Sequence, residues 1–532
     1  MAAPSAASHQ SSSLHWRSDP PAHLFATNDA PNAADARIVR KILALQQTHL
    51  DSLNSGIAQL HVILRKLESE RAGLGKRMAV NAGLLSPLRS LPVEVLEEIF
   101  IRAVPEPGER KERWFAKQSP WSIARVCRRW RAVAYGYPKL WSTIFIDLED
   151  SAPTTPLLLR QLKLSTTYPL RIHFWSAVSF DAGLNLLQIL ALHAERWELA
   201  DIRITSAVQA RMLDKLGKRL SRLRFLRLEW RLPSTQHQTE LAGVFGKTPA
   251  LRHVTLSDTG SGTRTLGIQW QRLTSLDLTA SALNMVAILR SCTALVECRL
   301  RPLGYENNLG ALVRLPHLRK LYSTDTQIFQ HLFLPALTDL YLPHDCTQLV
   351  TALIQRSGCT LRSLYTFEGC TPRAVLRILG ECPSLARLGM QFSSSWGLSD
   401  LLHYLTPPAG VLNKSSRSRT LVPQLAALAI GITGPPQQPP HNDEQLLEDL
   451  FEVAAARSGS SSLRNFGLFL PQAIWSELPE VEHLSERLEL LRRHLYSHVA
   501  FTDDGLGQWG GCCVPRVLDG EGWMDPMVYF TK

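Results

Sequence analysis

The sequence predicts an α/β solenoid, a stack of short strand-and-helix units, preceded by a small all-α domain and one long amphipathic helix. Two observations predict this fold class: a leucine pattern that recurs along most of the chain, and two different helical patterns that come before it. The chain has 532 residues, 45% of them hydrophobic, so it is long enough for several domains and has the apolar content of a folded protein.

The first segment, residues 1–34, is rich in Ala, Ser, Pro and Asn and has few apolar side chains. We expect it to be disordered, because burial of so little apolar surface does not offset the entropy lost on ordering. It has no apolar stretch of signal-peptide length, and no later run approaches the roughly 18 apolar residues of a membrane span. We therefore expect a cytoplasmic or nuclear protein that does not enter a membrane.

An amphipathic helix is predicted over residues 35–80. Apolar side chains recur there at alternating steps of four and three, which is the spacing of a heptad seam. Two of the same steps fall on Gln46 and Arg71, and the apolar seam positions are Val39, Leu43, Leu50, Leu53, Ile57, Leu60, Leu64, Leu67 and Leu74. Two interpretations stay open: a coiled coil that forms a homodimer through residues 39–74, or a single helix folded back on its own chain. Gly56 and Gly73 weaken an independent coil.

Two short helices are predicted within residues 84–146. In "SPLRSLPVEVLEEIF", residues 86–100, Pro92 suits a first helical turn, and apolar residues follow at helical spacing. In the second helix Pro120 again suits the first turn, Gly136 and Pro138 end the helix, and an apolar stripe is formed by Ile123, Val126, Cys127 and Trp130. Most of the arginines of this second helix fall on its other face.

A repeating unit occupies residues 147–475. The pattern LxxLxL begins at Leu223, Leu273 and Leu337, and degraded copies begin at Leu199, Leu251, Leu295, Leu318, Leu361, Leu385, Leu425 and Leu463. Between 199 and 385 the starts are 19 to 28 residues apart, which is the period of a leucine-rich repeat. One strand and one helix cannot bury their own leucines, whereas stacked units share a continuous core. We expect residues 476–532 to form a capping helix, around 476–498, and a tail.

A target-binding surface is predicted on the strand face opposite the leucines. Because side chains alternate along a strand, positions five and seven of each unit point away from the leucine core. These positions hold an aromatic and cationic patch made of Arg299, Arg301, Tyr322, Tyr341 and Tyr365. Tyr and Arg are enriched at binding hot spots, although an ordinary solvated sheet face remains the alternative.

Signatures of catalysis and of metal sites are missing from the sequence. None of GxxxxGK[ST], GxSxG or HExxH occurs, so we expect neither an enzyme nor a cofactor. The nine cysteines include no CxxC pair, and we expect no metal site. The formal net charge of +11 favours acidic partners, while nucleic acid is an unlikely partner.

The segment from Ser86 to Ile144 resembles an F-box, and it is most similar to the F-box-like proteins of mushroom-forming fungi, in which a predicted coil precedes the motif. The resemblance implies a substrate-recognition subunit of an SCF-type ubiquitin ligase that binds a Skp-type adaptor, and through it a cullin, while the repeats hold a protein target. It assigns adaptor binding to Leu91, Pro92, Glu94, Leu96, Ile99, Phe100, Val126, Cys127, Trp130 and Trp141. The stretch from 105 to 120 is longer than in the shortest F-boxes. A leucine-rich repeat scaffold outside a ligase, a basic nucleic-acid binder and a hydrolase remain alternatives, as does a closed helical hairpin packed on the first repeat.

Overall fold

The computed structural model of the chain separates into two compact units, Met1–Val95 and Leu96–Lys532. The residues that the structure describes are 19–26, 28–104, 120–147, 155–175, 181–204, 213, 216, 219–230, 243, 245–257, 266–304, 310–342, 347–366, 370–392, 397–407, 421–432, 441–459, 463–471 and 496–502.

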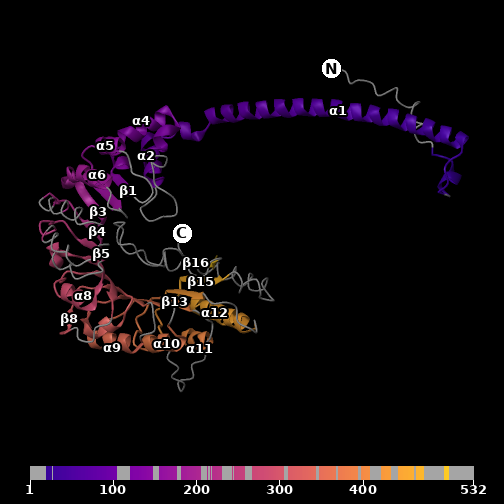
Figure 1. The fold of residues 1–532 in the computed structure, drawn as a ribbon. Coiled ribbons are helices and arrows are strands. Elements are labelled where there is room, and N and C mark those ends of the chain that lie inside the picture. Colours follow the sequence, from indigo (N-terminus) through magenta and orange to yellow (C-terminus); the bar gives the residue numbers. More distant parts are fainter. Residues whose placement is uncertain are drawn as a thin grey trace. The chain divides into compact units, whose positions relative to one another are not determined.

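The first unit is dominated by the long helix α1, Ala33–Leu84, drawn in indigo in Figure 1. Its first turn is capped by Asn32, whose side-chain oxygen accepts hydrogen bonds from the backbone N–H groups of Ala34 (3.0 Å) and Asp35 (2.9 Å). The helix covers the whole range 35–80 predicted from the heptad pattern. Within residues 1–34, expected to be disordered, Ala22–Phe25 form the short 3-10 helix η1. Residues 1–18 lie outside the described part of the chain, so the prediction of disorder remains a prediction there.

Short helices follow α1 in the sequence. They are η2 (Pro87–Arg89), α2 (Val93–Arg102), α3 (Ile123–Val126), α4 (Arg128–Gly136) and η3 (Pro138–Trp141). The single second helix predicted from the sequence is in fact two helices. The chain is extended at Cys127, with φ −156° and ψ 173°, so α3 ends there and α4 begins one residue later.

A parallel sheet of 14 strands forms the framework of the second unit. Each strand pairs with the next strand of this sheet along the chain, and β8 and β10 form a separate two-stranded sheet. The strands are β1 (Thr143–Asp147), β2 (Leu170–Trp175), β3 (Trp197–Ile204), β4 (Phe225–Trp230), β5 (His253–Ser257), β6 (Ser275–Ser281), β7 (Glu297–Leu303), β8 (Val313–Arg314), β9 (Lys320–Ser323), β10 (Leu332–Phe333), β11 (Asp339–Leu342), β12 (Ser363–Thr366), β13 (Arg387–Phe392), β14 (Ala427–Ile432), β15 (Asn465–Pro471) and β16 (Tyr496–Thr502).

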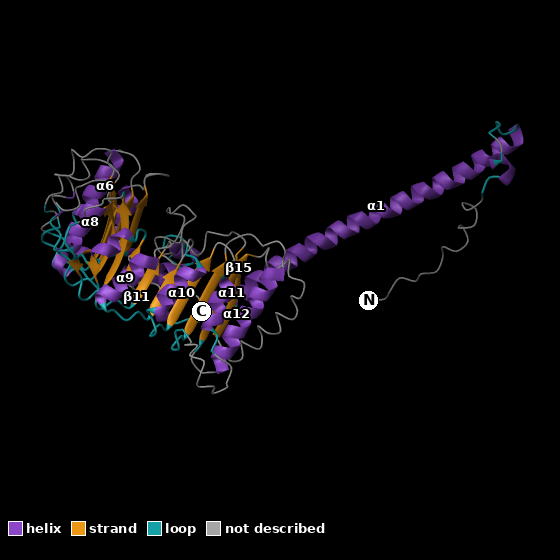
Figure 2. Ribbon diagram, turned by 90° about the horizontal axis from the view of Figure 1, so that it is seen from below, coloured by secondary structure: helices purple, strands orange, loops and turns teal. Residues whose placement is uncertain are grey.

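Helices and 3-10 turns connect the strands and cover one face of the sheet (Figure 2). The helices are α5 (Thr155–Leu164), α6 (Asp181–Ala191), α8 (Ala282–Leu289), α9 (Thr347–Ser357), α10 (Pro372–Gly380), α11 (Leu398–Leu405) and α12 (His441–Gly459). The 3-10 helices are η4 (Ala194–Arg196), η7 (Trp270–Arg272) and η8 (Gln327–His331). Parallel neighbours need such crossover connections, since a tight turn reverses the chain direction.

The core lies between the sheet and these helices. In β6 the side chains of Leu276 and Leu278 are buried with Leu273, and the same alternation in neighbouring strands joins one hydrophobic cluster from Ile144 to Phe466. The chain therefore has an N-terminal helical region followed by a large parallel sheet with helices.

The C-terminal end of the sheet differs from our expectation. We predicted a capping helix around 476–498, but residues 496–498 belong to strand β16, which pairs in parallel with β15. The sheet therefore extends past residue 475, where the repeat region was expected to end. Residues 472–495 and the tail from 503 onward lie outside the described residues.

Candidate protein-binding sites

Helix α2 contributes four of the ten residues that the resemblance assigns to adaptor binding, and Leu91 and Pro92 come directly before it. In the first unit Pro92 and Glu94 are exposed and Leu91 is half-buried. In the second unit Ile99 is 38% exposed, whereas Leu96 and Phe100 are completely buried. Leu96 and Phe100 are four residues apart and share one helix face; Ile99, three residues after Leu96, lies beside them on the same apolar stripe but stays partly exposed.

Three residues assigned to adaptor binding are therefore core residues. Leu96, Phe100 and Trp141 have no exposed surface in this chain, so their burial does not favour direct adaptor contact, and that assignment stays a prediction. Trp141 is held from several sides. Its indole N–H donates a hydrogen bond to the carbonyl of Ala134 (2.7 Å), and its ring centroid lies 4.7 Å from that of Trp121 and 5.7 Å from that of Tyr135.

The break between α3 and α4 presents the second exposed group. Val126, at the end of α3, is 60% exposed, and Cys127 is also exposed. The Cys127 sulfur accepts a hydrogen bond from the backbone N–H of Trp130 (3.4 Å) and so caps α4. Trp130 is half-buried because its ring packs against Phe100, with centroids 5.0 Å apart. The buried Phe100 thus supports a partly exposed tryptophan.

Arginines surround this exposed group. Arg125, Arg128, Arg129 and Arg131 are all exposed, and Arg131 also donates to the carbonyl of Ala124 (2.9 Å). We define Ile99, Val126, Cys127 and Trp130 as the helical apolar patch. An apolar patch with guanidinium groups beside it suits an acidic protein partner with an apolar groove.

The second candidate site, on the sheet, has the predicted register. Asp277, Arg299 and Tyr322 are paired across β6, β7 and β9, and Tyr341 and Tyr365 continue the row on β11 and β12. The sequence pattern therefore placed these side chains correctly in one row of the sheet.

The expected exposure of this row is wrong. Tyr341 and Tyr365 are each 2% exposed, and Arg299 and Tyr322 are also buried. The rings of Tyr341 and Tyr365 stack with centroids 4.7 Å apart and planes at 11°, and the Arg299 guanidinium lies 5.2 Å from the Tyr322 ring centroid. These side chains pack against one another and are buried, so they are not an open docking surface.

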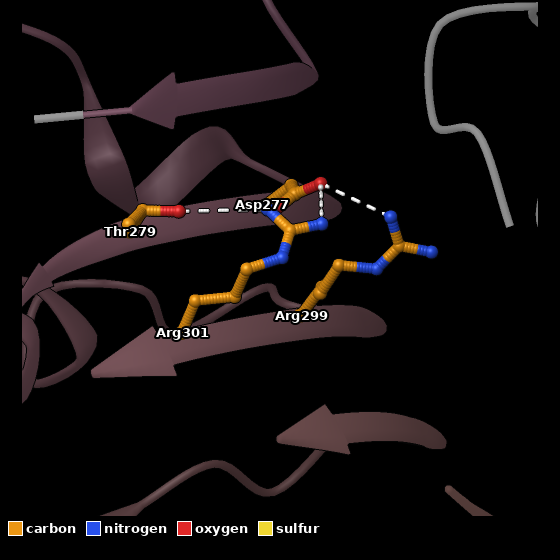
Figure 3. A network of polar contacts seen from close by, with 4 residues as sticks. All are labelled: Asp277, Thr279, Arg299 and Arg301. Atoms are coloured by element: carbon orange, nitrogen blue, oxygen red, sulfur yellow. Dashed lines mark hydrogen bonds and ion pairs between the residues drawn. The ribbon is translucent and has the colours of Figure 1, made fainter. Parts of the chain in front are cut away.

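Asp277 is the centre of the polar part of the row (Figure 3). Its carboxylate accepts hydrogen bonds from Arg299 (3.3 Å) and Arg301 (2.9 Å), and Arg301 also approaches the Thr279 hydroxyl at 3.5 Å. Burial lowers the pKa of Arg299, an effect that the charge of Asp277 opposes. For Tyr322 the direction is the reverse: burial raises its pKa, and the positive charge of Arg299 opposes that rise. Of the five predicted target-binding residues, Arg301 alone keeps a partly exposed side chain, at 31%.

The sequence reasoning missed a second polar network on the same face. His173 and Asp201 are buried partners 3.2 Å apart, and Asp201 lies 3.8 Å from the guanidinium of Arg227. The three residues occupy paired positions of β2, β3 and β4. Arg227 is the fifth residue of the unit that begins at Leu223, as Arg299 is of the unit that begins at Leu295, so extending this alignment toward the N-terminus would have found its partners.

The buried cysteines have the character of small apolar groups. Burial raises the pKa of Cys292 and of Cys382 to about 12, so both stay protonated at neutral pH. Among the described residues, no group of three or more His, Cys, Asp or Glu side chains is arranged to hold a metal ion. In the same residues, no helix combines the length and apolar character that crossing a membrane requires.

Comparison with known families bears on the helical segment. Residues 88–147 match the family model described as F-box-like. This range contains α2, α3, α4, η3 and β1, and thus the whole helical apolar patch. A search of curated proteins found no match. F-box domains generally bind Skp-type adaptors. Residues 88–147 are accordingly an F-box-like domain, followed in the chain by a large parallel sheet with helices.

Proposed function

We propose that the chain is the substrate-recognition subunit of an SCF-type ubiquitin ligase. The observation that carries this proposal is the F-box-like domain at residues 88–147, whose family generally binds Skp-type adaptors. The exposure of Ile99 and Val126 supports it, because the domain leaves apolar side chains available for a partner. Through the adaptor the chain reaches a cullin, and it acts in the cytoplasm or the nucleus.

The sheet region is the proposed target-binding part. We interpret it as a leucine-rich repeat array, because most of its strands begin two residues after the first leucine of an LxxLxL unit, as β6 does at Ser275 after Leu273. Stacked units form an extended surface suited to a protein partner. The chain itself contributes no catalysis; it accelerates ubiquitin transfer by holding the target at high effective concentration near the ligase.

The adaptor contacts divide into two classes. Ile99, Val126, Cys127 and Trp130 are the proposed contacts in the second unit, with Leu91, Pro92 and Glu94 in the first. Leu96, Phe100 and Trp141 act indirectly, because they hold the helices in place. Substitution of a core residue would therefore disturb folding and binding together, whereas substitution of a contact would disturb binding alone.

The test is adaptor binding by an Ile99→Asp, Val126→Asp variant. Two charges at exposed apolar contacts should weaken binding of a recombinant Skp-type adaptor by about 30-fold or more, since loss of an interface anchor typically costs about 2 kcal/mol. The matched control is Leu159→Asp, an exposed leucine on α5 outside the F-box-like segment, which should bind normally. Equal adaptor affinity of the double variant and the control, measured by calorimetry, would contradict the proposal and favour a scaffold outside a ligase.

A further inference from the structure

Helix α1 carries an apolar seam that is exposed to solvent. The same spacing continues to Met78, four residues after Leu74. Nine side chains of this seam are each between 50% and 66% exposed, namely Leu43, Leu50, Leu53, Ile57, Leu60, Leu64, Leu67, Leu74 and Met78. Exposure of so many large apolar groups on one helix indicates a protein partner, because monomeric proteins rarely leave such a surface in water. The alternating steps of four and three make a helix of the same kind the fitting partner.

The order of residues along the seam indicates which helix is the partner and in which direction that partner helix runs. Gln46 and Arg71 interrupt the apolar seam near opposite ends, and the midpoint between them lies between Ile57 and Leu60. Suppose that a second copy of α1 runs in the opposite direction about this midpoint. Each seam residue of one copy then meets the seam residue of the other copy for which the two residue numbers add to 117. The apolar layers are then Val39 with Met78, Leu43 with Leu74, Leu50 with Leu67, Leu53 with Leu64, and Ile57 with Leu60.

The two polar residues meet each other in this arrangement. Gln46 of each copy faces Arg71 of the other, because 46 and 71 also add to 117, so the side-chain amide oxygen can accept a hydrogen bond from the guanidinium. A parallel pair in register would instead place Arg71 against Arg71 inside the seam, where like charges repel. The seam is therefore complementary to its own reversed copy.

We propose that the chain forms an antiparallel homodimer through α1, with Gln46 of each protomer paired with Arg71 of its partner. The proposal does not depend on the ligase role of the F-box-like domain. At 1.5 Å per residue the 52-residue helix is about 78 Å long, so this dimer holds the C-terminal ends of the two helices far apart. In a parallel dimer those ends would be adjacent.

Charge substitutions at Gln46 test the orientation in the full-length protein. Gln46→Glu should tighten the antiparallel dimer roughly tenfold, since it creates two ion pairs with Arg71, and Gln46→Arg should weaken it by a similar factor. In a parallel dimer both variants would weaken association, because position 46 would face itself. Thr48→Glu, on the same turn but outside the seam, is the matched control and should leave the dimer constant unchanged. The measurement is sedimentation equilibrium over a concentration series.

A disulfide across the seam provides an independent test of the orientation. Leu53 and Leu64 face each other in the antiparallel dimer, so in a Leu53→Cys, Leu64→Cys variant oxidation should join position 53 of one protomer to position 64 of the other, as identified by peptide mass spectrometry. Along one helix the same two positions are about 17 Å apart, too far for a disulfide. Weakening by both Gln46 variants, with disulfides that join position 53 to position 53, would overturn the orientation. A protein that stays monomeric at high micromolar concentration would overturn the dimer itself.

Discussion

Several arginines of the sheet region serve as structural hydrogen-bond donors. Arg196 donates to the carbonyl of Tyr168 (2.9 Å), Arg219 to that of Leu192 (2.7 Å) and Arg356 to that of Leu332 (2.8 Å). Arg457 is buried in α12 and donates to the carbonyls of Leu405 (2.6 Å), Leu421 and Val422. Burial lowers the pKa values of Arg196 and Arg457. Each side chain satisfies carbonyls in an earlier unit, so part of the positive charge has a structural explanation other than binding nucleic acid.

Gly389 leaves space for the stacked rings of Tyr341 and Tyr365, because its side chain is a single hydrogen atom. A Cβ atom at this position would lie 2.6 Å from Cδ1 of Tyr365, the ring that also stacks on Tyr341. Gly389 is thus the residue that allows the buried Tyr365 ring to lie flat across β13.

We predict that Gly389→Ala destabilises the sheet region by about 1–3 kcal/mol, because the Tyr365 ring must move in a packed environment. Gly380→Ala is the control: it lies at the end of α10 with no atom near its added Cβ, and it should be neutral or slightly stabilising. Urea denaturation followed by fluorescence measures both. Combining Gly389→Ala with Tyr365→Ala should cost less than the sum of the two changes, and strict additivity would contradict the proposed clash.

At the scale of elements, much of the sheet could be predicted from the sequence. Strands β4, β6 and β11 begin two residues after Leu223, Leu273 and Leu337, the first leucines of the three complete units. The leucine spacing predicts these strands because it reflects which strand face is buried. β2 was missed because its sequence, LRIHFW, lacks the LxxLxL spacing, although Leu170, Ile172 and Phe174 do alternate toward the core. Alternation predicts which face a side chain occupies, but it carries no information on how completely that face is covered, so the burial of Tyr341 was not predictable.

The same limit applies to the F-box-like helices. Leu96, Ile99 and Phe100 all fit one apolar stripe in the sequence, and only the packing of the surrounding helices separates the exposed Ile99 from the two buried residues. The break at Cys127 was also not predictable from periodicity, because the apolar spacing continues across it from Val126 to Trp130.

The cap at Cys127 leads to a test of the helical apolar patch. We predict that a bulky maleimide at neutral pH modifies the exposed Cys127 and thereby blocks adaptor binding, while Cys292 and Cys382 stay unmodified in the folded protein. Burial and a pKa raised to about 12 both disfavour their reactive thiolates. Peptide mass spectrometry identifies the modified sites.

Cys127→Ser is the matched variant for this test, since serine can cap α4 and does not react with maleimide. Its adaptor binding should survive treatment with the reagent, which also controls for cysteines outside the described residues. Loss of binding by the treated Cys127→Ser protein, or full binding by modified wild type, would place the adaptor contact elsewhere.

At the scale of the whole molecule, the two proposed interfaces use different residues. The seam of α1 ends at Met78, whereas the helical apolar patch begins at Ile99. Dimerisation and adaptor binding should therefore be separable by mutation. A dimeric receptor would also present two target-binding regions, which raises avidity for a target with two accessible sites.

The last prediction follows from this separation and is measured as the mass of the adaptor complex. The wild-type 59.5 kDa chain should form a complex of two chains and two adaptors, seen by native mass spectrometry. Leu53→Asp with Leu60→Asp places charges in the apolar seam, where their desolvation is unfavourable, and should give a complex of one chain and one adaptor with unchanged adaptor affinity. The reciprocal control, Ile99→Asp with Val126→Asp, should stay a dimer and bind no adaptor. If the seam variant loses adaptor binding as well, the two interfaces are coupled. In that case α1 and the helical apolar patch do not carry dimerisation and adaptor binding as independent functions.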